Sequence, residues 1–238
     1  MIFIFKKRIA ISIILALFGI FSISYVSFIK GESIINASNE IKTYKIVVDA
    51  GHGAPDGGAV SSDGVEEAGL NLEIAEKLRD ALEDEGFLVI MTREDENNIA
   101  DADKQKSLRE MKSSDLNNRV NIANNSGADI MISIHMNKFE GGSSWGWQTF
   151  YSKNSDEGKR LASLVQSSIQ KNIDRVNKRV ALSIEGIKIV DKTNIPVIIV
   201  ECGFLSNAED LRLLQTEEYQ NKIVIGIIDG VKEFYSSL

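Results

Sequence analysis

The two histidines of this 238-residue chain are its best candidates for chemistry, because each follows a short apolar segment. Residues 45–49 (KIVVD) lead to His52, within Ala50-Gly51-His52-Gly53, and residues 129–134 (DIMISI) lead directly to His135. Both apolar segments are typical of buried strands. In an open parallel sheet, ligands and reacting groups gather beyond the carboxyl ends of the strands. A lone histidine is more often structural, but two at matching strand ends predict a shared metal ion.

A carboxylate follows a third apolar segment, since residues 196–200 (PVIIV) lead to Glu201. A hydrolytic zinc ion usually takes three protein ligands from histidine and acidic residues, and it lowers the pKa of a water in the fourth position to about 7. We expect the remaining ligand in the loop or helix start after the first histidine. The candidates there are Asp56, Asp63, Glu66 and Glu67, and composition does not choose among them.

The elements that must position these groups alternate between strands and helices. Apolar periodicity predicts the following ranges: strands at 45–49, 87–91, 129–134, 187–190 and 196–200, an edge strand at 145–151, and helices at 70–85, 115–123, 161–169, 206–215 (with a Ser206–Glu209 capping box) and 217–235. Residues 94–114 are polar and predict a long surface excursion. This order predicts an α/β fold, a mainly parallel twisted sheet with helices on both faces, in a single domain.

The N-terminal segment differs in composition from the rest of the chain. Lys6-Lys7-Arg8 is basic, and residues 9–29 then run for 21 residues without a charge. About 20 apolar residues span a bilayer, whereas the apolar core of a signal peptide has roughly 7 to 15. We therefore expect residues 1–30 to be a signal peptide or, preferably, a membrane anchor, 31–43 to be a linker, and 44–238 to be an exported, extracytoplasmic catalytic domain.

Charge and cysteine content exclude two classes of protein. Residues 1–30 carry four basic and no acidic residues, so the net charge changes from −7 for the whole chain to −11 for the remainder. Such an acidic domain is a poor partner for nucleic acid. Cys202 is the only cysteine, so no intrachain disulfide forms, and its apolar surroundings predict a small buried hydrophobe rather than a nucleophile.

Five motifs occur in an order that resembles a known family. They are Gly51-His52-Gly53, Asp56-x-Gly58-Ala59, Glu67 ahead of Asn71-Leu72-x-Ile74-Ala75, Ser133-Ile134-His135, and Glu201-x-Gly203-Phe204-Leu205-Ser206-Asn207. Together they resemble the zinc-dependent N-acetylmuramoyl-L-alanine amidases of the amidase-3 family, from about residue 44 to 235. The resemblance implies that Zn²⁺ is bound by His52, Glu67 and His135. It implies that Glu201 is the catalytic acid and base in hydrolysis of the amide between N-acetylmuramic acid and L-alanine of the stem peptide.

Further motifs resemble the sporulation-specific, CwlD-type branch of that family. They are Asp115-Leu116-x-x-Arg119, the stretch 147–151 (WQTFY), and Asn177-x-Arg179. This resemblance implies action on spore cortex peptidoglycan, after which a separate deacetylase allows muramic δ-lactam to form for recognition during germination. Two departures from the family pattern, Ala54 in place of a second glycine and Met136 after the second histidine, leave the implied ligands intact.

Peptidoglycan is the partner that the resemblance implies, and three arginines are possible substrate-binding residues. Arg93, Arg119 and Arg179 could bind stem-peptide carboxylates or the lactyl carbonyl through bidentate hydrogen bonds, although structural ion pairing is equally open for each. The acidic domain has no appended wall-binding repeats, so we expect retention through the N-terminal membrane segment or an exported partner protein.

Two alternative functions remain open from the sequence. Fold and metal do not determine which amide is cut, so another zinc peptidase or amidohydrolase of similar fold is one alternative. The other is a non-catalytic wall-binding module. The presence of all four chemical residues argues against that module, because binding alone does not require them.

Overall fold

The computed structural model describes residues 43–104 and 107–237. The predicted signal peptide or anchor at 1–30, and all but the last residue of the 31–43 linker, lie outside these ranges. Within the described ranges, no helix is both long and apolar enough to cross a membrane. The described residues belong to one compact unit.

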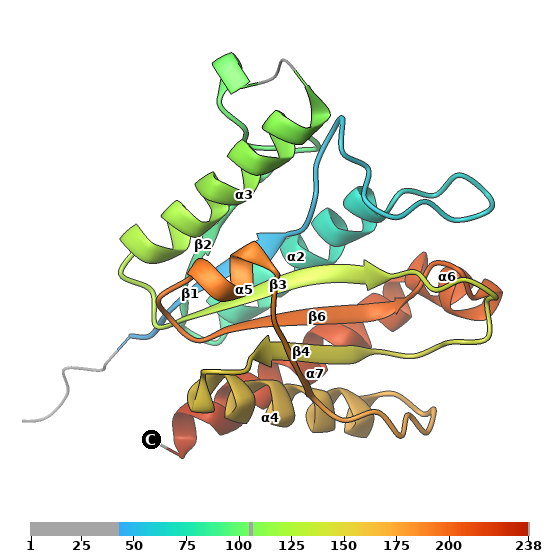
Figure 1. Ribbon diagram of the computed structural model, residues 1–238. Coiled ribbons are helices and arrows are strands. Elements are labelled where there is room, and N and C mark those ends of the chain that lie inside the picture. The colour runs from blue at the N-terminus through green and yellow to red at the C-terminus, as the bar shows by residue number, and fades with distance from the viewer. Residues whose placement is uncertain (1–42, 105–106, 238) are drawn as a thin grey trace, which may run out of the picture. The chain divides into compact units, whose positions relative to one another are not determined.

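The described residues form a six-stranded sheet with helices on both faces (Figure 1), which confirms the predicted fold class. The strands, in the spatial order β2-β1-β3-β6-β4-β5, are β2 (Leu88–Met91), β1 (Lys45–Ala50), β3 (Ile130–Asn137), β6 (Val197–Phe204), β4 (Gln148–Ser152) and β5 (Leu182–Ile184). The helices are α2 (Glu67–Asp84), the 3₁₀ turn η1 (Ala102–Lys104), α3 (Leu108–Asn125), α4 (Asp156–Asn172), α5 (Lys188–Lys192), α6 (Ala208–Leu214) and α7 (Glu217–Ser236). The first four strands are parallel, whereas β4 runs antiparallel to β6.

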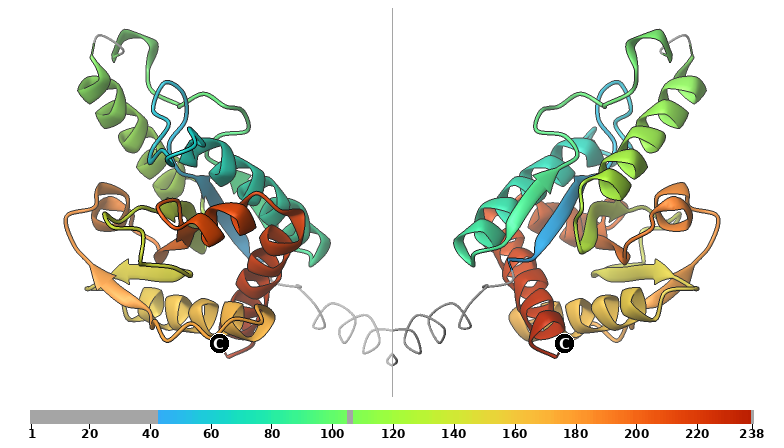
Figure 2. Two further views of the ribbon diagram at one scale, coloured as in Figure 1. Left: turned by 90° about the vertical axis from the view of Figure 1, so that its right-hand side faces the viewer. Right: turned by 90° about the vertical axis from the view of Figure 1, so that its left-hand side faces the viewer.

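Alternation of side chains along the strands gives the two faces of the sheet different roles. One face carries the larger core, in which residues such as Ile46, Val48 and Ile132 pack with residues of α2, α4 and α7. The other face carries a smaller core that includes Val47 and Met131 with residues of α3 and α5. Figure 2 shows α4 and α7 together on the side away from α3.

Two strand predictions were wrong. Residues 187–190, predicted as a strand, lie at the start of α5, because Ile189 and Val190 bury one side of a short helix in the smaller core. A four-residue apolar run does not distinguish these two structures. The predicted edge strand at 145–151 begins only at Gln148 and lies inside the sheet, between β6 and β5.

Helix boundaries also differ from the prediction, most of all at the start of α3, and α6 has a different capping residue. Helix α3 begins at Leu108, where Ser107 accepts a hydrogen bond from the amide of Glu110, so the last part of the expected excursion 94–114 is helical. Sequence periodicity missed this turn because α3 buries polar as well as apolar residues. The cap of α6 is Asn207 rather than Ser206, since its side chain accepts from two backbone amides at 3.1 Å.

Candidate metal and catalytic site

Three neighbouring parallel strands bring the predicted chemical groups to one edge of the sheet. His52 follows β1, His135 lies in β3 and Glu201 lies in β6. His135 and Glu201 are register partners in adjacent strands, so their side chains leave the same face. That face is the one covered by α3 and α5, because Ser133 and Ile199, two residues earlier in each strand, lie on it as well.

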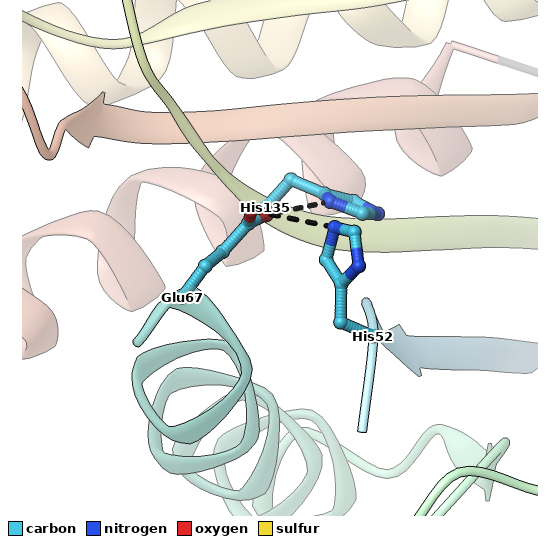
Figure 3. Close-up of side chains that lie close together, drawn as sticks. All are labelled: His52, Glu67 and His135. Carbon is cyan, nitrogen blue, oxygen red and sulfur yellow. Dashed lines mark hydrogen bonds and ion pairs between the residues drawn. The ribbon is translucent and has the colours of Figure 1, made fainter. Parts of the chain in front are cut away.

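The third predicted ligand, Glu67, is the first residue of α2 and lies between the two histidines (Figure 3). Its Oε1 is 2.8 Å from Nδ1 of His135, and its Oε2 is 3.3 Å from Nε2 of His52. The backbone amides of Ala59 and Met136 donate to the same carboxylate, at 2.8 and 3.0 Å. The start of a helix favours a negative charge, and these donors fix where the charge lies.

Two glycines allow this close approach. A Cβ at Gly51 would collide with the imidazole of His135. A Cβ at Gly58 would lie 2.6 Å from Oε2 of Glu67 and 2.7 Å from Cδ2 of His52, and the φ of Gly58 is +71°. The glycines of the first two sequence motifs are therefore required by the packing of the site.

The three side chains fit a zinc ion. One ligand atom from each of His52, Glu67 and His135 lies within 4.8 Å of the other two. Two imidazoles and one carboxylate are a donor set used by catalytic zinc. Asp56 accepts from Nδ1 of His52 at 3.0 Å, so Nε2 of His52, which faces Glu67, would be the ring atom available to a metal ion.

The electrostatics of the cluster favour a positive charge at its centre. Burial disfavours the charged form of His52, but hydrogen bonds and negative charge from Glu67 and Asp56 outweigh burial and raise its pKa to about 9. Burial would raise the pKa of Glu67, but the two histidines hold it far below its usual range. A divalent cation bound to neutral imidazoles would compensate the negative charge of Glu67 in the same way.

Glu201 lies beside this cluster in a different environment. Its Oε2 atom is buried and has no hydrogen-bond partner among the described residues. Burial is the largest influence and raises its pKa to about 7, with the nearby charge of Glu67 adding to the rise and the histidines opposing it. A carboxyl group with this pKa can both accept and donate a proton near neutral pH.

These groups open onto a cavity of about 300 Å³. The two histidines and Glu201 line one part of it, and Lys112 and Asp56 lie at its polar rim. The cavity also has an apolar lining, formed by Leu116, Phe150, Ile184, Ile187, Ile189 and Ile199. An amide flanked by apolar groups therefore fits this cavity better than a fully polar substrate does.

Of the three arginines predicted as possible substrate-binding residues, Arg119 lines the cavity, whereas Arg93 and Arg179 do not. Arg119 is 1% exposed, and Arg93 is 4% exposed with four hydrogen bonds to backbone carbonyls. These contacts support a structural role for Arg93 and Arg119, which the sequence analysis had left open beside substrate binding. Arg179 lies over the ring of Phe204, 5.0 Å from its centroid, and does not line the cavity, so its substrate role stays a prediction.

Sequence reasoning missed a buried polar cluster beneath the site. Asp49 is 0% exposed and accepts hydrogen bonds from Ser133 at 2.5 Å, Thr92 at 2.7 Å and Arg119 at 2.6 Å. The signal for it was the aspartate that ends the apolar run 45–49, since a buried carboxylate requires partners.

Comparisons with known proteins identify the family of this chain. Residues 46–233 match the Amidase_3 model, described as N-acetylmuramoyl-L-alanine amidase. The germination-specific N-acetylmuramoyl-L-alanine amidase of Bacillus subtilis is 35% identical over 191 residues, which are 80% of this chain and 79% of that protein. The CwlD amidase of Clostridioides difficile, solved in complex with the GerS lipoprotein, is 38% identical with a TM-score of 0.80, over 82% of this chain and 100% of that chain.

A second solved structure supports the same assignment. An N-acetylmuramoyl-L-alanine amidase from Clostridium difficile 630 is 30% identical with a TM-score of 0.71, over 82% of this chain and 98% of that chain. The family match covers all four chemical residues, from His52 to Glu201. The chain therefore belongs to the N-acetylmuramoyl-L-alanine amidase family and is an enzyme of peptidoglycan hydrolysis.

Proposed function

We propose that this enzyme binds Zn²⁺ through His52, Glu67 and His135, and uses Glu201 as the acid and base that cleaves the amide between N-acetylmuramic acid and L-alanine. The observation that carries the proposal is the buried, unpartnered Oε2 of Glu201 beside a His-Glu-His cluster. An unpartnered carboxylate oxygen costs stability, so its retention at this position is best explained by catalysis.

The bound metal would supply a Lewis acid that activates water and polarises the scissile carbonyl. The residues of this chain do the remainder. Asp56 accepts from Nδ1 of His52 and thereby fixes the tautomer and orientation of the ring. Glu201 takes a proton from the attacking water and gives it to the departing amino group of L-alanine, which its pKa of about 7 permits in both directions.

The apolar wall of the cavity suits the groups on both sides of this amide. The lactyl group of muramic acid and the side chain of L-alanine each carry a methyl group. Phe150 and Ile199, which pair across β4 and β6, line the same cavity as Glu201 and the two histidines. Apolar contact there would exclude water around the scissile bond and strengthen the interactions of Glu201.

The biological setting follows from the relatives, two of which are named for germination or for a lipoprotein complex. We extend this setting to the present chain. Its substrate is spore cortex peptidoglycan, and its product is a glycan in which muramic acid has lost the stem peptide. A separate deacetylase then allows muramic δ-lactam to form from that product. An exported lipoprotein is the class of partner that the solved complex supports. Export through residues 1–30 would place the domain on the side of the membrane that faces the cortex.

The decisive experiment is digestion of purified cortex peptidoglycan by the full-length protein, with and without added zinc, beside Glu201→Gln. Zinc-dependent appearance of free L-alanine amino termini, lost in the variant while bound zinc is retained, is the expected result. We expect the loss to be about 10²- to 10⁴-fold, the usual contribution of a positioned acid and base. Cleavage of a different peptide bond would support another zinc peptidase, and equal activity of Glu201→Gln would refute the assigned role.

A further inference from the structure

His52 has an unusual backbone conformation for a residue with a side chain. Its φ is +62°, and it is the single residue other than glycine with a positive φ within residues 43–104 and 107–237. The left-handed region crowds Cβ against the backbone and is rarely occupied without an external constraint. Something in the fold must therefore hold this part of the chain in place.

Arg119 of α3 supplies that constraint by binding the backbone on both sides of the turn. Its Nη2 donates to the carbonyl oxygen of His52 at 2.5 Å, and its Nη1 donates to the carbonyl oxygen of Ala50 at 2.6 Å. Nη1 also donates to the carboxylate of Asp49 at 2.6 Å. One planar guanidinium thus contacts three of the four residues from the end of β1 to the histidine.

The guanidinium is itself held rigidly by its own helix. Asp115, one turn earlier in α3, accepts from Nε at 2.7 Å and from Nη2 at 3.1 Å. All five N–H groups of Arg119 are therefore used, and its side chain is 2% exposed. Because a lysine ammonium cannot reproduce a planar fork of donors, the arginine at this position is specific.

We propose that Arg119 is a positioning residue that holds His52 in its strained conformation, so that the imidazole is preorganised beside Glu67 and His135 to bind zinc. The inference rests on the proposed zinc site and adds to it the group that sets its affinity. In this role Arg119 acts through the backbone carbonyl oxygens of Ala50 and His52. Helix α3 therefore braces the metal-binding loop.

The test is Arg119→Lys in the full-length protein, which keeps the positive charge and removes the fork. We measure the zinc dissociation constant by competition with a chelator, and the imidazole ¹⁵N resonances of the metal-free protein. The sequence has two histidines, so the spectrum contains two imidazoles and His135 serves as an internal reference. We expect zinc to bind about 10- to 100-fold more weakly, and the resonances of His52 to shift or broaden more than those of His135.

Arg175→Lys is the matched control. Arg175 also binds a buried aspartate, Asp210, at 2.6 Å, but its ion pairs go to α6 rather than to the metal-binding loop. If the effect of Arg119→Lys came only from a lost ion pair or from poorer packing, Arg175→Lys would weaken zinc binding to the same extent. Positioning predicts that Arg175→Lys binds zinc like the wild type, with both histidine resonances unchanged.

Each outcome separates the inference from the proposed function. Failure of the wild type to bind zinc would overturn the proposed zinc site, and the metal-free spectrum alone would then decide whether Arg119 positions His52. Unchanged zinc affinity and unchanged His52 resonances in Arg119→Lys would overturn the inference. If that variant does not fold, the isosteric Asp115→Asn weakens the hold on Arg119, and a smaller shift in the same direction is required.

Discussion

Two glycines of α7, one turn apart, allow a close contact with α4 on the face of the sheet that carries the larger core. A Cβ added at Gly230 would lie 2.6 Å from the Cα of Val165, and one at Gly226 would lie 2.5 Å from the Cα of Ile169. Val165 and Ile169 are one turn apart in α4 and are fully buried. The two helices therefore meet backbone to backbone, and Gly230→Ala tests this contact.

The expected magnitude follows from two opposing effects. Alanine is better than glycine in a helix by about 1 kcal/mol. Against this, carbon atoms pack at about 3.5 to 4.0 Å, so a contact of 2.6 Å requires α4 to move by about 1 Å. Overpacking costs typically 1–3 kcal/mol, and we take the upper end because a backbone atom cannot rotate away. The free energy of unfolding should fall by about 2 kcal/mol after the gain is subtracted.

Gly69→Ala provides the matched control. Gly69 lies in α2, and a Cβ there would meet no atom within 4 Å. The helix preference then acts alone and should raise the free energy of unfolding by up to about 1 kcal/mol. Urea unfolding of both variants, followed by circular dichroism, measures the difference. If Gly230→Ala were as stable as Gly69→Ala, the close contact of α4 and α7 would be refuted.

Three further predictions concern single side chains. In the metal-free protein the pKa of His52 is raised to about 9, above its unfolded value of about 6.5. The stabilisation of the folded protein by protonated His52 is therefore complete below about pH 6.5 and is lost as the pH rises through about 9. An NMR titration of His52, together with unfolding midpoints measured at both ends of this pH range, checks this. Asn207→Ala removes the cap of α6 and should lower the free energy of unfolding by about 1 kcal/mol in urea titrations. Cys202 is fully buried with its pKa raised by burial, so iodoacetamide should modify it only at the rate of unfolding, as mass spectrometry would show.

The sequence predicted where the polar groups lie better than it predicted the elements around them. A polar residue at the end of an apolar run is a local signal, and this signal alone predicts that His52, His135 and Glu201 lie at one edge of the sheet. The choice of Glu67 over Asp56, Asp63 and Glu66 needed the family resemblance. In the structure, only the approach of the start of α2 to both histidines distinguishes Glu67 from its neighbours.

The wrong predictions for α5 and for the start of α3 share one physical cause, which is that the smaller core is built from short or polar segments. Helix α5 has five residues, too few for helical periodicity to appear. Helix α3 buries Asp115 and Arg119, so its inward face does not show an apolar pattern. Both segments owe their structure to tertiary contacts with the sheet, which a local pattern does not contain.

The difference between the two faces of the sheet also explains why the chemistry is located where it is. Helices α2, α4 and α7 close one face, and α4 and α7 approach so closely that glycines are needed between them. The other face is covered by α3 and the short α5, and residues of both helices line the cavity beside the proposed metal ligands. Changes in α4 and α7 should therefore alter stability without altering the site, whereas α3 forms part of the cavity and holds the backbone of His52. Arg119 holds that backbone through its carbonyl oxygens, and every residue type carries such an oxygen. The sequence around Arg119 therefore does not distinguish a residue that positions His52 from one that binds substrate.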